Sequence, residues 1–179
     1  SSRDGVNFHR WEEAFLRPGA ERPGAWYYGH QFIAWHAVET PSALKGAPNE
    51  LSLYATEGDW LGDGKTLRRF TLRLDGFVSA HASTKGGELI TRPFVFDGSQ
   101  LSLNYATSAA GSVWVELQDG RGRPMPGYKL SDCDELFGDT VDRIVAWQGK
   151  TDVSSAIGKT VRLRFWLRDA DVYSFQFQK

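Results

Sequence analysis

The chain has 179 residues and a formal net charge of −1, which fits a domain of ordinary size and offers no basic surface for a nucleic acid. Aromatic residues reach 13%, with 7 Trp beside 19 Gly, a balance that disfavours both a helical bundle and a disordered chain. No apolar run approaches the ~18 residues of a membrane-spanning helix, so we expect no membrane partner. The aromatic and glycine content instead favours short strands joined by glycine turns.

Residues 1–66 have the pattern of an irregular segment with few strands. Four of the seven prolines fall there, and proline interrupts the hydrogen-bond ladder of a sheet. Only short strands are therefore expected, at Trp26–Tyr28, Gln31–His36 and Glu50–Thr56. We predict that this segment forms an accessory layer on a second domain, residues 67–179.

Residues 67–179 alternate between apolar and polar positions, with turn dipeptides such as Asp75-Gly76 and Asp97-Gly98 between the alternating segments. Short strands at this spacing predict an all-β fold, an antiparallel β-sandwich that is jelly-roll-like. The predicted strands are Leu67–Leu74, Phe77–Ser83, Glu88–Phe96, Gln100–Ala106, Gly111–Asp119, Arg143–Ala146, Val161–Arg168 and Val172–Gln178.

The alternation also assigns a face to each side chain, because every second residue of a strand points the same way. Aliphatic residues and the rings of Phe70, Tyr105 and Phe165 fall on the predicted core faces. Trp114 and Trp166 fall on the polar faces, beside charged neighbours. A large ring on the solvent side of a sheet is informative, since the core does not require it.

Several segments resemble parts of known glycoside-hydrolase-like proteins. Ser2–Trp11 and Glu50–Glu57 resemble β-propeller blade segments of glycoside hydrolases similar to families 32 and 43. Arg68–Ser79, Leu103–Ser112 and Asp169–Phe175 resemble the C-terminal β-sandwich that follows such propellers in bacterial proteins. Residues 1–66 can supply only about one to one and a half propeller blades, so the catalytic funnel of those hydrolases is not expected here.

The resemblance implies a noncatalytic carbohydrate-binding module attached to a glycoside hydrolase, in an extracellular or periplasmic location. Its partners would be a polysaccharide or oligosaccharide and the catalytic domain of a parent chain. Because the chain begins with Ser1, we expect it to derive from a longer protein.

The composition favours carbohydrate binding independently, because sugar rings stack their apolar faces on flat aromatic rings and their hydroxyls bond planar polar groups. The predicted binding residues are Trp114, Trp166, Glu116, Arg162, Arg164 and Arg73, with Trp60 in a glycine-rich loop. An alternative is that residues 1–66 or a partner cover these rings, which would make the module purely structural.

Two pairs of aspartates suggest a structural calcium ion. Asp132 and Asp134, and likewise Asp169 and Asp171, are one residue apart, and Ca²⁺ prefers such hard oxygen ligands. The alternative is that these acids cap turns and meet arginine side chains. Cys133 is expected to be a small buried hydrophobic residue, and Trp147 a ring of the core or its edge.

Glycoside hydrolysis would need two carboxyl groups at a fixed separation across the scissile bond. Asp4 fits a turn in which its side chain bonds backbone amides. The other candidate acids of this segment are Glu39, Glu57, Asp59 and Asp63. Glu57 follows a predicted strand and precedes a glycine, a location where active-site acids occur, but no pair of carboxylates can be assigned as acid and nucleophile. A hydrolase fragment that keeps catalytic carboxylates therefore stays the second hypothesis.

Overall fold

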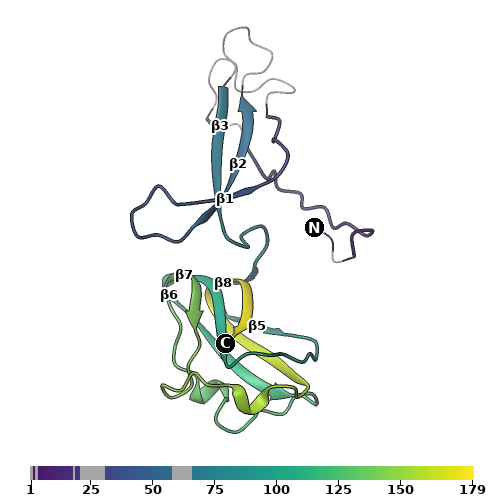
Figure 1. The fold of residues 1–179 in the computed structure, drawn as a ribbon, viewed down its shortest axis with the longest axis vertical. Coiled ribbons are helices and arrows are strands. Elements are labelled where there is room, and N and C mark those ends of the chain that lie inside the picture. Colours follow the sequence, from purple (N-terminus) through teal and green to yellow (C-terminus); the bar gives the residue numbers. More distant parts are fainter. Residues whose placement is uncertain (1, 3, 18, 21–30, 58–65) are drawn as a thin grey trace. The chain divides into compact units, whose positions relative to one another are not determined.

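The computed structural model describes residues 2, 4–17, 19–20, 31–57 and 66–179, and it is built from strands (Figure 1). The strands are β1 (Val38–Thr40), β2 (Glu50–Glu57), β3 (Thr66–Arg73), β4 (Ala80–Ala82), β5 (Gly87–Ile90), β6 (Gln100–Asp119), β7 (Asp139–Ile144) and β8 (Val161–Gln178). Two short 3-10 turns, η2 (Leu130–Asp132) and η3 (Ser154–Ala156), complete the elements. The predicted all-β, antiparallel fold is thus confirmed. In the described part of the chain, no helix has the length and apolar character needed to cross a membrane.

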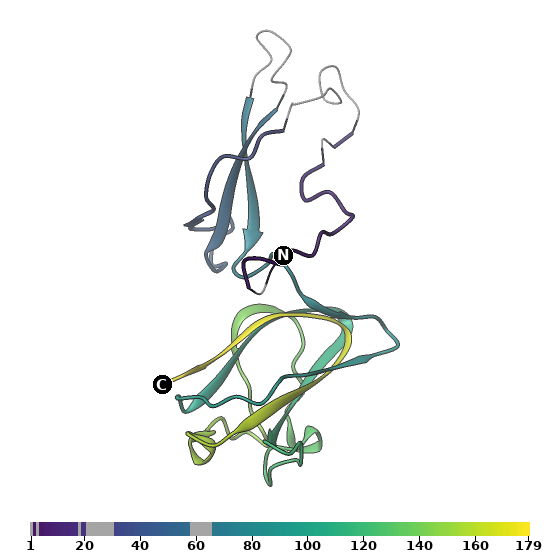
Figure 2. The same cartoon turned by 90° about the vertical axis from the view of Figure 1, so that its right-hand side faces the viewer.

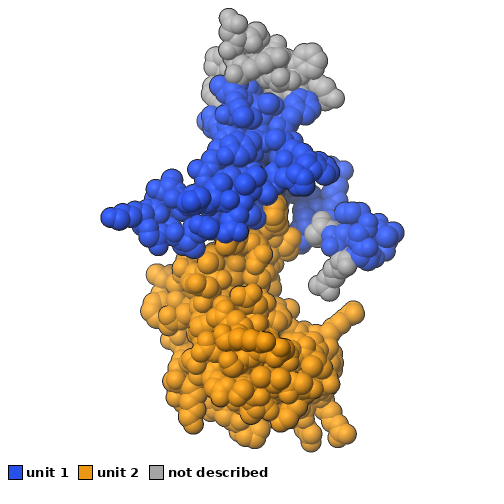
Figure 3. Space-filling model, viewed as in Figure 1, with its two compact units in different colours: residues 1–72 blue, residues 73–179 orange. Residues whose placement is uncertain are grey.

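The chain divides into two compact units, residues 1–72 and 73–179, coloured separately in Figure 3. The first unit contains a three-stranded sheet in which β2 lies between β1 and β3. The Arg69 side chain of β3 donates hydrogen bonds to Ser52 on β2 (2.7 Å) and to Thr40 on β1 (3.0 Å), and it pairs with Glu50 at 2.6 Å. One guanidinium thereby joins all three strands.

The N-terminal segment forms the turn that was predicted for Asp4. The Asp4 carboxylate accepts hydrogen bonds from the backbone amides of Val6 (2.9 Å) and Asn7 (2.7 Å) and from the Asn7 side chain. These bonds, above all the one from the Asn7 amide, hold the pKa of the Asp4 carboxyl well below its ordinary value. Asp4 is thus a turn residue.

The second unit is organised by β6 and β8, which run antiparallel beside each other and curve together (Figures 1 and 2). β7 pairs with the first half of β6, and β4 and β5 pair with successive parts of β8. The sheet order is β4-β8-β6-β7, with β5 beside β8. Since the sheet curls on itself, two strands supply both layers of a sandwich-like fold.

A sharp bend interrupts the β6–β8 ladder near its middle. Thr107 pairs with Ala170 and Ser112 with Arg168, so the four residues between on β6 face Asp169 alone. Asp169 has a left-handed backbone (φ 46), and a Cβ on Gly111 would lie 2.3 Å from its carbonyl oxygen. β6 and β8 are therefore each one long strand, bent by an enlarged bulge, where the sequence predicts two short strands apiece.

The core lies inside the curled sheet, where the predicted alternation is confirmed. The inner residues of both halves of β6 and β8 form one buried cluster. Its members on these two strands are Leu101, Leu103, Tyr105, Val113, Val115, Leu117, Val161, Leu163, Phe165, Leu167, Ala170 and Val172. Phe70 differs from the prediction, because it lies half-buried in the first unit.

Trp147 and Cys133 lock the segment after β6 onto the core. The buried Trp147 indole donates a hydrogen bond to the Val115 carbonyl (2.9 Å), and the Val115 amide donates to the Cys133 sulfur (3.2 Å). Burial raises the pKa of the Cys133 thiol to about 11, and nearby Asp134 adds to the rise. Trp147 is thus a core ring, and Cys133 the buried small residue that was predicted.

The Cys133 thiol should react slowly in the native protein. A rise in its pKa to about 11, from an ordinary value of 9.0, lowers the thiolate fraction at pH 8 by about a hundredfold, and burial slows access further. We expect labelling by an aromatic disulfide reagent to be at least that much slower in buffer than in concentrated guanidinium. Equal rates in both solutions would contradict the burial of this thiol.

Gly111 should be required by the bend. In Gly111→Ala the new methyl group would collide with the Asp169 and Arg168 carbonyls, at 2.3 and 2.9 Å, and we expect a loss of about 3 kcal/mol of unfolding free energy. Gly127→Ala is the control, because it has a positive φ of 83 but no atom within 4 Å of the new methyl. Chemical denaturation of both variants measures the difference. A loss for Gly111→Ala no larger than that for Gly127→Ala, which comes from the strain of its positive φ alone, would contradict the collision.

Candidate functional site

The two tryptophans that the alternation left outside the core lie directly across from each other. Trp114 on β6 is the register partner of Trp166 on β8, and both rings are half-buried. Together with Leu130 and Ser131 of η2 they line an open hollow of about 310 Å³. The sequence-predicted rings therefore meet on one outer face of the second unit.

Different neighbours hold the two indoles. Trp114 packs against the buried core cluster. Trp166 lies against the turn before β5, where a Cβ on Gly86 would come within 2.9 Å of the ring. Gly86 has a φ of 80 and its amide bonds the Ser83 carbonyl, so glycine is needed both for the turn and for the space that Trp166 occupies. Trp114 is thus packed against the core, whereas Trp166 is packed against the turn before β5.

A charged group adjoins the two rings on the same face. Arg164 is the register partner of Glu116 and lies 3.6 Å from its carboxylate, while its other terminal nitrogen bonds Glu88. The bond to Glu88 is the main cause of a raised pKa for the Arg164 guanidinium. Glu88 in turn faces Trp166 across β5 and β8. The site therefore has an ion-paired edge beside its aromatic floor.

Glu116 supports the site from below. It is only 3% exposed, and its carboxylate accepts hydrogen bonds from the Gln118 amide (2.8 Å) and the Leu130 backbone amide (3.2 Å). Through the second bond it fixes the start of η2, which forms one wall of the hollow. Glu116 therefore positions the wall, while Arg164 is the more accessible member of the pair.

Arg162 lies two residues further along the same face, opposite Gln118. Its Nε atom is buried without a hydrogen-bond partner, and no ion pair to Arg162 is seen among the described residues. The charge of Arg162 is consequently not neutralised in the way that Arg164 is. It remains able to meet a polar ligand that extends from the tryptophans.

Arg73 does not join the tryptophans. Its guanidinium bonds the Asn104 side chain (2.7 Å) and the Thr140 carbonyl (2.9 Å), pairs with Asp139 (2.7 Å) and covers the Tyr173 ring. These partners lie on the other half of the bent sheet. Trp60 falls outside the described residues.

The four aspartates considered for calcium are spread over separate contacts. Asp132 caps η2 by accepting from the Lys129 amide (3.3 Å), and Asp134 accepts from the Gly149 amide (3.0 Å). Asp169 sits at the bend, and Asp171 accepts from the Ser79 hydroxyl at 2.6 Å. Among described residues no three His, Cys, Asp or Glu side chains gather as metal ligands. Calcium binding stays a prediction.

The acid considered for catalysis, Glu57, ends β2 in the first unit. Its side chain is buried, and its carboxylate pairs with Arg68 at 2.9 Å. The Glu57 carboxylate is therefore engaged by a neighbouring side chain of the first unit.

No pattern in the sequence marks three residues of the site, namely Leu130, Ser131 and Glu88. The first two lie in a short turn without hydrophobic periodicity, so no pattern marks them. Glu88 begins a predicted strand, but its position beside Trp166 depends on the register of β5 with β8. The glycine pair at Gly86-Gly87 was the only available signal, and it indicated a turn.

No family model matches the chain, and searches of curated proteins and of solved structures likewise returned no similar protein. The site must therefore be interpreted from its own geometry.

Glu116 should be a supporting residue whose removal costs stability. In Glu116→Ala the half-buried backbone amide of Leu130 and the buried side-chain amide of Gln118 lose an acceptor, and we expect the unfolding free energy to fall by about 2–3 kcal/mol. Glu88→Ala removes a more exposed partner of the same arginine and should cost less than about 1 kcal/mol. Urea denaturation compares them, and a cost for Glu88→Ala equal to that for Glu116→Ala would contradict the supporting role.

Proposed function

We propose that residues 73–179 form a noncatalytic carbohydrate-binding module whose platform is the hollow between Trp114 and Trp166. The observation that carries this proposal is the pairing of two half-exposed indoles across neighbouring strands, beside an open hollow. Adjoining aromatic rings form an apolar patch, and such patches commonly mark a site that meets another molecule.

The chemistry of the face suits a sugar. A pyranose presents an apolar face of C–H groups to an indole, and burial of that area contributes about 1–2 kcal/mol per ring. Its hydroxyls require directional partners, which the Arg164 guanidinium, the Ser131 hydroxyl and the Arg162 guanidinium offer nearby. A ligand longer than one sugar would be needed to reach Arg162, since four residues of a strand span about 13 Å.

We infer further that the module serves a glycoside hydrolase and works outside the cytoplasm. This inference depends on the resemblance of Ser2–Trp11 and Arg68–Ser79 to segments of such enzymes. The module would hold its parent enzyme near a polysaccharide, which raises the effective concentration of the substrate.

Trp166→Ala should weaken glycan binding without unfolding the protein. Loss of one stacking ring predicts about a fivefold to thirtyfold lower affinity, measured by calorimetry or affinity electrophoresis on a polysaccharide panel. Trp114→Phe tests the second ring while it keeps an aromatic group against the core. Trp35→Ala is the matched control, because Trp35 is 87% exposed and belongs to the first unit.

Two results would count against the proposal. The first is that the wild-type protein binds no member of the panel. The second is that Trp166→Ala and Trp35→Ala bind with equal affinity. Quenching of the tryptophan fluorescence by added sugars gives an independent reading of the same contact.

A further inference from the structure

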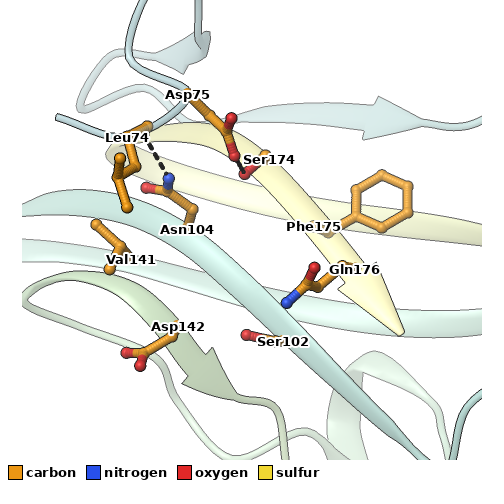
Figure 4. Close-up of a pocket in the computed structure, with 9 residues that line it drawn as sticks. All are labelled: Leu74, Asp75, Ser102, Asn104, Val141, Asp142, Ser174, Phe175 and Gln176. Atoms are coloured by element: carbon orange, nitrogen blue, oxygen red, sulfur yellow. Dashed lines mark hydrogen bonds between the residues drawn. The ribbon is translucent and has the colours of Figure 1, made fainter. Parts of the chain in front are cut away.

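A second cavity, of about 340 Å³, opens on the other half of the bent sheet (Figure 4). It runs over the outer face of the first half of β6 and the last half of β8, with β7 along one side. Its volume is at the lower end of the range for small-molecule sites. It shares no lining residue with the tryptophan hollow.

Fixed polar side chains form the upper part of this groove. Asn104 is 3% exposed; its oxygen accepts from the Arg73 guanidinium (2.7 Å), and its amide donates to the Leu74 carbonyl (2.8 Å). Beside it the Ser174 hydroxyl donates to the Asp75 carboxylate at 2.5 Å, as Figure 4 shows. The wall is therefore preorganised, because its groups are held before any ligand arrives.

Ser102 provides a polar group without a partner at the floor of the groove. It is only 3% exposed, it lines the cavity, and it lies on β6 opposite Gln176 of β8. Within the part of the chain that the structure describes, its hydroxyl makes no side-chain hydrogen bond. The hydroxyl lines the groove, so it is available to bond a molecule that enters there.

The charge of the lining selects among ligands. Asp75 and Asp142 both line the groove, and no Lys, Arg or His does. The Arg73 guanidinium, which bonds Asn104 of the lining, is also engaged by Asp139 at 2.7 Å. An anionic ligand would therefore be repelled, whereas an ammonium group would be attracted to the two carboxylates.

We infer that this groove is a second ligand site, which binds a small hydroxylated molecule that carries a free ammonium group. The ammonium lies toward Asp142 and Asp75, and the ligand hydroxyls bond Ser102 and the amide of Gln176. The site is independent of the proposed function of the tryptophan hollow.

Nuclear magnetic resonance on the full chain tests the inference with defined probes. D-glucosamine should shift the backbone amide signals of residues 102–104, 141–142 and 174–176 at millimolar concentration. N-acetyl-D-glucosamine and D-glucose, which have the same ring without the charge, should shift them at least about fivefold less at equal concentration.

Two variants locate the interaction. Asp142→Asn should weaken glucosamine binding about fivefold, and Ser102→Ala about threefold to tenfold. Asp97→Asn makes the same change of charge at an exposed residue outside the groove and should leave the affinity within about twofold of the wild type.

The inference is overturned if glucosamine leaves the groove signals unmoved, or if glucose moves them equally. It also fails if Asp97→Asn weakens binding as much as Asp142→Asn. The indole N–H signals of Trp114 and Trp166 report on the other hollow in the same spectra. Failure of either site is therefore seen separately from failure of the other.

Discussion

The second unit depends on one constraint, the antiparallel pairing of β6 with β8 on both sides of a bend. Because side chains alternate between its register shifts, each strand sends one set of side chains inward and another outward. The bend at Gly111 and Asp169 turns the inner sets of the two halves into a common core. The outer sets of the two halves are thereby separated into the tryptophan hollow and the polar groove.

Hydrogen bonds of buried polar groups fix the segments that pack against β6 and β8. Trp147 and Cys133 tie the segment after β6 to Val115, and Glu116 holds the start of η2. These bonds are directional, so they fix where the covering segment lies in a way that apolar burial alone does not. The hollow beside Trp114 exists because η2 is held at that place.

The sequence predicted the inner and outer faces well, because a period of two depends only on local backbone geometry. It predicted Trp114 and Trp166 as outer rings for the same reason, but their direct pairing required the register, which the enlarged bulge determines. Arg73 was grouped with the tryptophans by residue type, whereas the fold uses it to hold Asn104. The sequence did not mark Ser102 as a site residue, since polar residues are common at outer strand positions and the groove that it lines is visible only in the structure.

The pairing of β6 with β8, which are not consecutive strands, has a consequence for the rate of folding. Gln100, at the start of β6, pairs with Gln178, near the end of β8, and β6 precedes β8 by the whole of β7 and its loops. The segment after β6 covers part of its apolar face through Trp147 and Cys133, but the paired strand β8 completes the core only when it has left the ribosome. The entropy of closing this long loop is lost before the stabilising contacts between β6 and β8 form, so we expect this unit to fold slowly for its size. Until β8 has been synthesised, exposed apolar residues of β6 can take part in misassembly.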